Sequence, residues 1–73
     1  MADMEMTPVT SSQINSVGFD PASGTLQIEF SKGALYSYDG CTQTEYDELV
    51  GAASVGQTFG ALIKGRKPYR RIG

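Results

Sequence analysis

The sequence predicts a small α+β domain, in which an antiparallel sheet is followed by two short helices packed on its apolar face. Three observations carry this prediction. In residues 25 to 31 the apolar and polar side chains alternate with a period of two, which is typical of a half-buried strand. After residue 42 the apolar spacing changes to three and four, which is typical of amphipathic helices. The chain has 73 residues, enough for one domain with a single small core.

The domain is predicted to span residues 11 to 73. Residues 1 to 10 show neither period, and we therefore expect them to be a flexible N-terminal leader. The first six residues also lack the basic and apolar regions of a signal peptide.

Three strands joined by short turns are expected to form an antiparallel meander. The first strand begins at Ile14 and ends before the turn formers of residues 20 to 24, and the second covers residues 25 to 31. A short loop at Gly33 leads into the third strand, residues 35 to 38. After Pro68, the last residues are compatible with a short fourth strand at an edge of the sheet.

Each predicted helix starts with a capping-box pattern. Thr42 and Glu45 introduce a first helix over residues 43 to 53, and the acids of its first turns complement the helix dipole. Ser54 introduces a second helix, and Gly65 is expected to end it. The apolar stripes of the two helices comprise Tyr46, Leu49, Val50 and Ala53, and then Phe59, Leu62 and Ile63.

Positive charge is concentrated in the last ten residues. Five of the six basic residues lie between positions 64 and 71, whereas the rest of the chain carries eight acids and one lysine. The net charge of −2 is therefore the sum of a positively charged C-terminal segment and a negatively charged remainder. A charge asymmetry of this kind indicates an anionic partner at one end, and guanidinium groups suit phosphate because they bind it bidentately.

The sequence argues against an enzyme, and we expect no cofactor and no metal. It contains no histidine and one cysteine, Cys41, so it has neither a usual general base nor a metal-ligand set. Cys41 is expected to be a passive thiol, and Ser11, Ser12 and Asp20 to make local hydrogen bonds. A single cysteine suits a reducing compartment, and no apolar run approaches the roughly 18 residues of a membrane span. We expect a soluble, cytoplasmic protein.

Over about residues 9 to 72 the chain resembles the KTSC domain, a small module that also occurs at the C-terminus of some lysyl-tRNA synthetases. The resemblance implies no catalytic reaction, and it suggests RNA by association only. The matching segments are Ser11-Ser12-x-Ile14, Val17-Gly18-Phe19-Asp20, Leu26-x-Ile28-x-Phe30, Gly33-x-x-Tyr36-x-Tyr38, Tyr46-x-x-Leu49, Ser54-x-Gly56-x-x-Phe59, Ile63-Lys64 and Pro68-Tyr69-Arg70-Arg71-Ile72.

The sequence therefore favours a non-enzymatic binding module whose C-terminal basic patch holds RNA or another phosphate-bearing ligand. Tyr69 would stack on a base or anchor the tail, and we favour an anchor, with Ile72 packed beside it. Tyr36 and Tyr38 would form either a stacking platform or part of the core, and the core is favoured. The alternative is an adaptor that binds a protein partner, with the patch serving only solubility or docking. The predicted binding residues are Lys64, Arg66, Lys67, Tyr69, Arg70 and Arg71.

Overall fold

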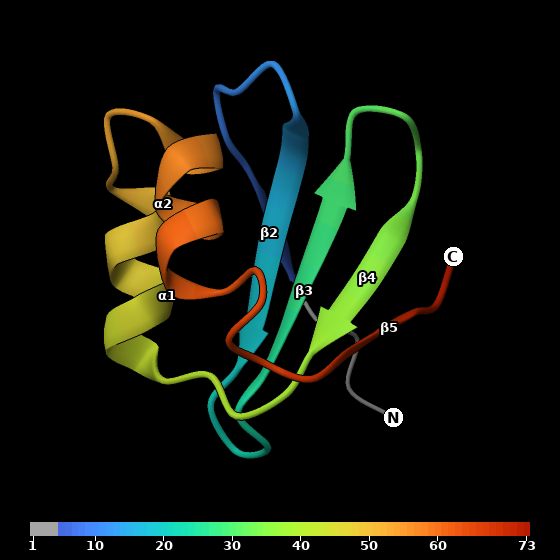
Figure 1. Cartoon of the computed structure of the whole chain (residues 1–73), viewed down its shortest axis with the longest axis vertical. Helices are drawn as coiled ribbons and strands as arrows, with labels where there is room; N and C mark the ends of the chain where they lie inside the picture. The colour runs from blue at the N-terminus through green and yellow to red at the C-terminus, as the bar shows by residue number, and fades with distance from the viewer. Residues whose placement is uncertain (1–4) are drawn as a thin grey trace.

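Five antiparallel strands in chain order form a single sheet, and both helices lie on one face of it (Figure 1). The computed structural model describes residues 5–73. The fold is therefore α+β, as the sequence predicts. The elements are β1 (Met6–Pro8), β2 (Ile14–Asp20), β3 (Thr25–Phe30), β4 (Leu35–Tyr38), α1 (Gln43–Val50), α2 (Val55–Leu62) and β5 (Tyr69–Arg71).

The sheet has one strand more than the three or four expected, because β1 lies within the predicted leader. β1 pairs with β2, with Thr7 opposite Val17, and the Val9 N–H donates to the Asn15 carbonyl at 3.0 Å. Three residues are too few to display a period, and this strand is held by backbone bonds to β2 rather than by an apolar face. The sheet thus starts before residue 11. Residues 1–4 of the predicted leader lie outside the described residues.

A bulge in β2 brings Ile14 and Val17 to the same face of the sheet. The register passes from Ile14 opposite Phe30 to Ser16 opposite Glu29, which leaves Asn15 as the extra residue. Without it, residues three apart would point to opposite faces. Both Ile14 and Val17 are fully buried in the core as a result.

Both helices begin where the capping patterns place them, and α1 ends earlier than predicted. The Thr42 hydroxyl accepts from the Glu45 N–H at 3.2 Å, and the Glu45 carboxylate accepts from the Thr42 N–H at 2.9 Å. α1 ends at Val50 rather than at residue 53, since Gly51 caps it and Ser54 already caps α2. Gly65 does not cap α2 directly but lies in the turn that follows, at φ +75°.

The core lies between the helix-bearing face of the sheet and the two helices. Leu26 and Ile28 of β3 are fully buried there, as is Leu49 of α1. Phe19 of β2 stacks on Tyr46 of α1 with ring centroids 5.6 Å apart. The face of the sheet that carries Leu26 and Ile28 is therefore the helix-bearing face, and the register of β4 and β5 decides which of their side chains lie on it.

Candidate functional site

The basic C-terminal segment is fastened to the sheet by its backbone. β5 pairs antiparallel with β4, with Tyr69 opposite Tyr38, and within residues 5–73 β4 is its only neighbour in the sheet (Figure 1). Just beyond β5, the Ile72 N–H donates to the Leu35 carbonyl at 2.8 Å. The short edge strand expected after Pro68 is thus present, and the side chains of the tail have defined directions.

Strand alternation separates the two adjacent arginines of the tail. Arg71 lies opposite Tyr36 and Arg70 lies opposite Ser37, so Arg71 belongs to the helix-bearing face and Arg70 to the open face. Arg71 also donates from Nε to the Gly73 carbonyl at 3.0 Å. The predicted binding residues therefore do not form one continuous patch, because neighbours in a strand point to opposite sides.

Lys67 makes a structural contact with the start of α1. Its Nζ lies 3.2 Å from Glu45 Oε1 and donates to the Gly40 carbonyl at 2.8 Å, and both charged side chains are only 20% exposed. Burial tends to raise the pKa of Glu45, but the Thr42 N–H and the Lys67 ammonium outweigh it and hold that pKa below its usual value. Lys67 thus connects the tail to the start of α1 through an ion pair. Because its ammonium is already paired and partly buried, it is less available to a ligand than predicted.

Lys64 and Arg66 lie in the turn between α2 and β5. The Lys64 N–H donates to the Phe59 carbonyl at 3.0 Å and the Arg66 N–H to the Ile63 carbonyl at 3.0 Å, which fixes the backbone of the turn. Both side chains are exposed. Arg70 and Arg71 are exposed as well, so Lys67 is the one cation of the predicted set that is partly buried.

An aromatic groove runs between α2 and the strands β3, β4 and β5, with a volume of about 860 Å³. Tyr38 is 5% exposed, and its partner across β5, Tyr69, is 63% exposed, with the two ring centroids 5.6 Å apart. Tyr69 also lies 5.8 Å from Tyr36. Tyr36 and Tyr38 are thus packed on the core face, as favoured from the sequence. The aromatic residues of the groove are Phe30, Tyr36, Tyr38, Phe59 and Tyr69.

Tyr69 and Ile72 were expected to be anchored, and both are held by contacts to β4 while remaining largely exposed. Tyr69 is 63% exposed and Ile72 is 45% exposed, and within residues 5–73 they are the exposed large hydrophobic side chains. An edge strand has a neighbour on one side only, so its side chains keep much of their surface. Tyr69 is held by its backbone pairing and by two neighbouring rings, yet most of its surface is exposed.

The charged residues that line the groove are two lysines. Lys32 comes from the loop between β3 and β4 and Lys64 follows α2, and among residues 5–73 no aspartate or glutamate lines the groove. Sequence reasoning missed Lys32, although it is the one basic residue outside the tail. Burial raises the pKa of Tyr38, and the nearby phenols of Tyr36 and Tyr69 act in the same direction. Tyr38 therefore stays neutral at physiological pH.

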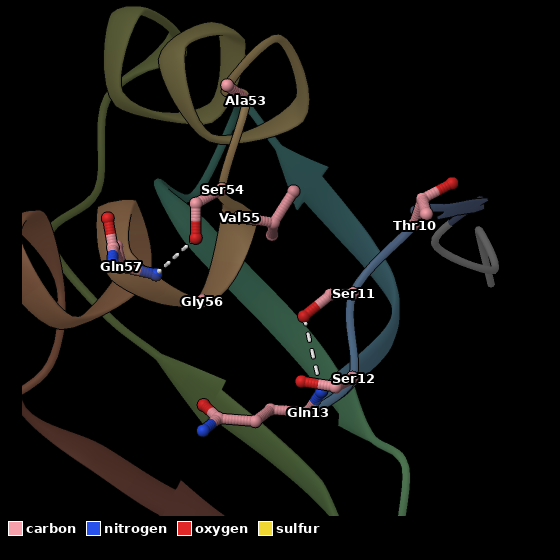
Figure 2. A pocket seen from close by; sticks show the side chains of 9 residues that line it. All are labelled: Thr10, Ser11, Ser12, Gln13, Ala53, Ser54, Val55, Gly56 and Gln57. Atoms are coloured by element: carbon pink, nitrogen blue, oxygen red, sulfur yellow. Dashed lines mark hydrogen bonds between the residues drawn. The ribbon is translucent and has the colours of Figure 1, made fainter.

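A smaller, polar pocket of about 310 Å³ lies between the β1–β2 loop and the start of α2 (Figure 2). Ser54 accepts from the Gln57 N–H at 3.4 Å, and Ser11 accepts from the Gln13 N–H at 3.2 Å. These hydroxyls face the pocket from opposite sides (Figure 2). They satisfy backbone donors, which agrees with the local hydrogen-bonding role expected for Ser11.

Cys41 lies in the core and is 6% exposed. Burial raises the pKa of its thiol, and the nearby Glu45 carboxylate acts in the same direction. Within residues 5–73 there is no group of three or more side chains able to hold a metal ion. Over the same residues, no helix is long and apolar enough to cross a membrane.

Comparison with known proteins places most of the chain in one family. Residues 10–69 match the model of the KTSC domain. A protein of Tsukamurella paurometabola is 38% identical over 61 residues, which cover 84% of this chain and 91% of that protein. A lysine–tRNA ligase of a Nostoc species is 36% identical over 59 residues, which cover 81% of this chain but only 10% of the ligase.

The fold also matches a solved structure. The crystal structure of a KTSC domain protein from Yersinia pestis aligns with a TM-score of 0.93 and 37% sequence identity. The alignment covers 97% of this chain and all of the other.

Proposed function

The chain belongs to the KTSC domain family, and we propose that it is a non-enzymatic module that binds RNA or another phosphate-bearing ligand. The proposed site is the helix-bearing side of β4 and β5, with the turn after α2 and the β3–β4 loop. The single observation that carries the proposal is Tyr69, an exposed aromatic at a groove whose charged lining residues, among residues 5–73, are lysines alone.

The distribution of charge supports an anionic ligand at this place. The chain has eight acidic and six basic residues, so an acid-free, lysine-lined groove departs from its average surface. Besides Arg70 on the open face, four cations are exposed around the proposed site or in the segments beside it: Lys32, Lys64, Arg66 and Arg71. Exposed lysine and arginine beside an aromatic ring is the combination that proteins use to bind single-stranded nucleic acid.

The chemistry of the groove supports binding rather than catalysis. Its polar side chains are lysines, tyrosine hydroxyls, serines and a glutamine. In the described part of the chain, no carboxylate or imidazole lines it to act as a general base, and burial raises the pKa of Tyr38 above its usual value, so its phenol is neutral too. We also place the protein in the cytoplasm, because a single buried thiol suits a reducing compartment.

The relatives add an association with RNA. A segment similar to this chain makes up about 10% of two proteins named lysine–tRNA ligase, from Nostoc and from Trichormus variabilis. The remainder of each ligase has no counterpart in this chain, so the association concerns the module and not the ligation reaction.

The proposal is tested by mobility shift with tRNA, single-stranded RNA and duplex DNA over a range of salt concentrations. Four phosphate contacts to a single strand predict a slope of about −2.8 in log affinity against log salt. The triple variant K64A/R66A/R71A should reduce the slope to about −0.7. Arg70→Ala is the matched control, because Arg70 lies on the open face and should leave the slope unchanged.

Two results would count against RNA as the ligand: no shift at low salt, or a slope near zero. If the wild-type protein instead captured one protein partner after nuclease treatment, and kept it with a charge-reversed tail, the adaptor role would replace the binding role.

A further inference from the structure

We propose that the aromatic groove binds an unpaired nucleobase, with Tyr69 as the stacking surface and Lys32 and Lys64 contacting the neighbouring phosphates. This proposal rests on the proposed function and specifies its ligand. It predicts that the module prefers single-stranded over duplex nucleic acid.

The first support is the setting of Tyr69. Its ring is inclined by 39° to Tyr36 and by 32° to Tyr38, with centroids 5.8 and 5.6 Å away. These two rings support Tyr69 from the core side, yet the residue keeps 63% of its surface exposed. A ring that neighbouring rings hold in place and that is still largely exposed loses little conformational freedom when a flat ligand stacks on it.

The second support is the wall of the groove next to Tyr69. Phe59 of α2 packs edge-on against Phe30 and Tyr38, with centroids 5.6 and 5.4 Å apart. These ring contacts form one wall of the groove, whose volume of about 860 Å³ is within the roughly 300 to 1,000 Å³ typical of small-ligand sites. A planar aromatic ligand fits such a wall better than a flexible aliphatic chain, because offset and edge-to-face ring contacts are favourable.

The third support is the position of the charges. Lys32 and Lys64 come from different segments, the β3–β4 loop and the turn after α2, and both line the groove. A nucleotide strand carries one negative charge per residue beside each base, so cations at an aromatic groove match that pattern. In a duplex the bases are stacked inside the helix, and only the phosphates could reach these lysines. The aromatic part of the site would then be unused.

The decisive experiment measures affinity by fluorescence anisotropy at low salt with three probes of equal length: single-stranded RNA, the same strand with abasic residues, and a duplex. Tyr69→Ala should weaken single-stranded RNA binding by about 5- to 150-fold, the range for loss of one stacked base. Tyr69→Phe should bind within about twofold of wild type, because it keeps the ring. The abasic strand should bind the wild-type protein about as weakly as RNA binds Tyr69→Ala.

Ile72→Ala is the matched control, since Ile72 is the neighbouring exposed hydrophobic residue and does not line the groove. It should leave all three affinities unchanged, and a thermal melt should confirm that both alanine variants fold. Two results would overturn the base site while leaving the phosphate-binding function in place. One is that the wild-type protein binds the abasic strand as tightly as RNA. The other is that Tyr69→Ala loses as much affinity for the duplex as for the single strand. Failure of all three probes to bind would overturn both.

Discussion

Replacing Glu45 by glutamine should destabilise the fold by about 1 kcal/mol at neutral pH. Glu45 Oε1 lies 3.2 Å from Lys67 Nζ, and this partly exposed ion pair is worth about 0.5 kcal/mol. The charge of Glu45 in the first turn of α1 adds about 0.5 kcal/mol through the helix dipole. The glutamine oxygen can still accept from the Thr42 N–H, so the capping bond itself is retained. For a domain of this size the midpoint of thermal unfolding should fall by about 4–8 °C.

The dependence on pH distinguishes this charge effect from a packing effect. The pKa of Glu45 is lower in the folded protein than in the unfolded chain, where it is about 4.3. The stabilisation is therefore fully present above that unfolded value and is lost as the pH falls through the folded pKa. In urea unfolding at pH 7, the unfolding free energies of wild type and Glu45→Gln should differ by about 1 kcal/mol. The two free energies should become equal at a pH below the folded pKa of Glu45.

The control and the double-mutant cycle locate the effect. Glu48→Gln removes one charge from an exposed position of the same helix and should change the unfolding free energy by less than about 0.5 kcal/mol. Combining Glu45→Gln with Lys67→Met should give a coupling of about 0.2 to 1 kcal/mol. A coupling of zero, or a difference between wild type and Glu45→Gln that does not change with pH, would refute the assignment of Lys67 to a structural ion pair.

Two further predictions concern the β2–β3 turn and the buried thiol. Gly24→Ala should be more destabilising than Gly33→Ala in urea unfolding. Both glycines have positive φ, but the Cβ added at residue 24 would lie 3.1 Å from the backbone oxygen of Cys41, whereas the Cβ added at residue 33 would have no atom within 4 Å. Gly33→Ala should cost only the backbone strain, about 1–2 kcal/mol, and equal losses would contradict the close approach. Cys41 should react slowly with a thiol reagent, at a rate that follows the unfolded fraction as urea is added, because it is 6% exposed and its pKa is raised. A rate in the folded protein equal to that of a free thiol would show that the site is open.

Elements with a readable local period were predicted well. The alternation from Thr25 to Phe30 identified β3, and Thr42 with Glu45 marked the start of α1. In both cases the signal lies in residues two to four positions apart, which is the distance over which strand and helix geometry acts. β1 lacked such a signal: it has three residues, and pairing with β2 rather than its own pattern makes it a strand.

The candidate site was only partly predictable for the same reason. Lys64 and Tyr69 were identified from charge and composition, whereas Lys32, Phe30 and Phe59 join the groove only because the hairpin and α2 pack against each other. Composition shows that positive charge is concentrated near the C-terminus, but it does not say which side chains share a surface.

By itself, the sequence determined the α+β class, the helix starts and the concentration of positive charge near the C-terminus. Only the tertiary structure decided how that charge is divided. The register of β5 against β4 sends Arg70 to the open face and Arg71 to the helix-bearing face, and the packing of the tail against α1 pairs Lys67 with Glu45. The physical reason is that register and ion pairing depend on segments far apart in the chain, whose contacts form only when the whole core is assembled.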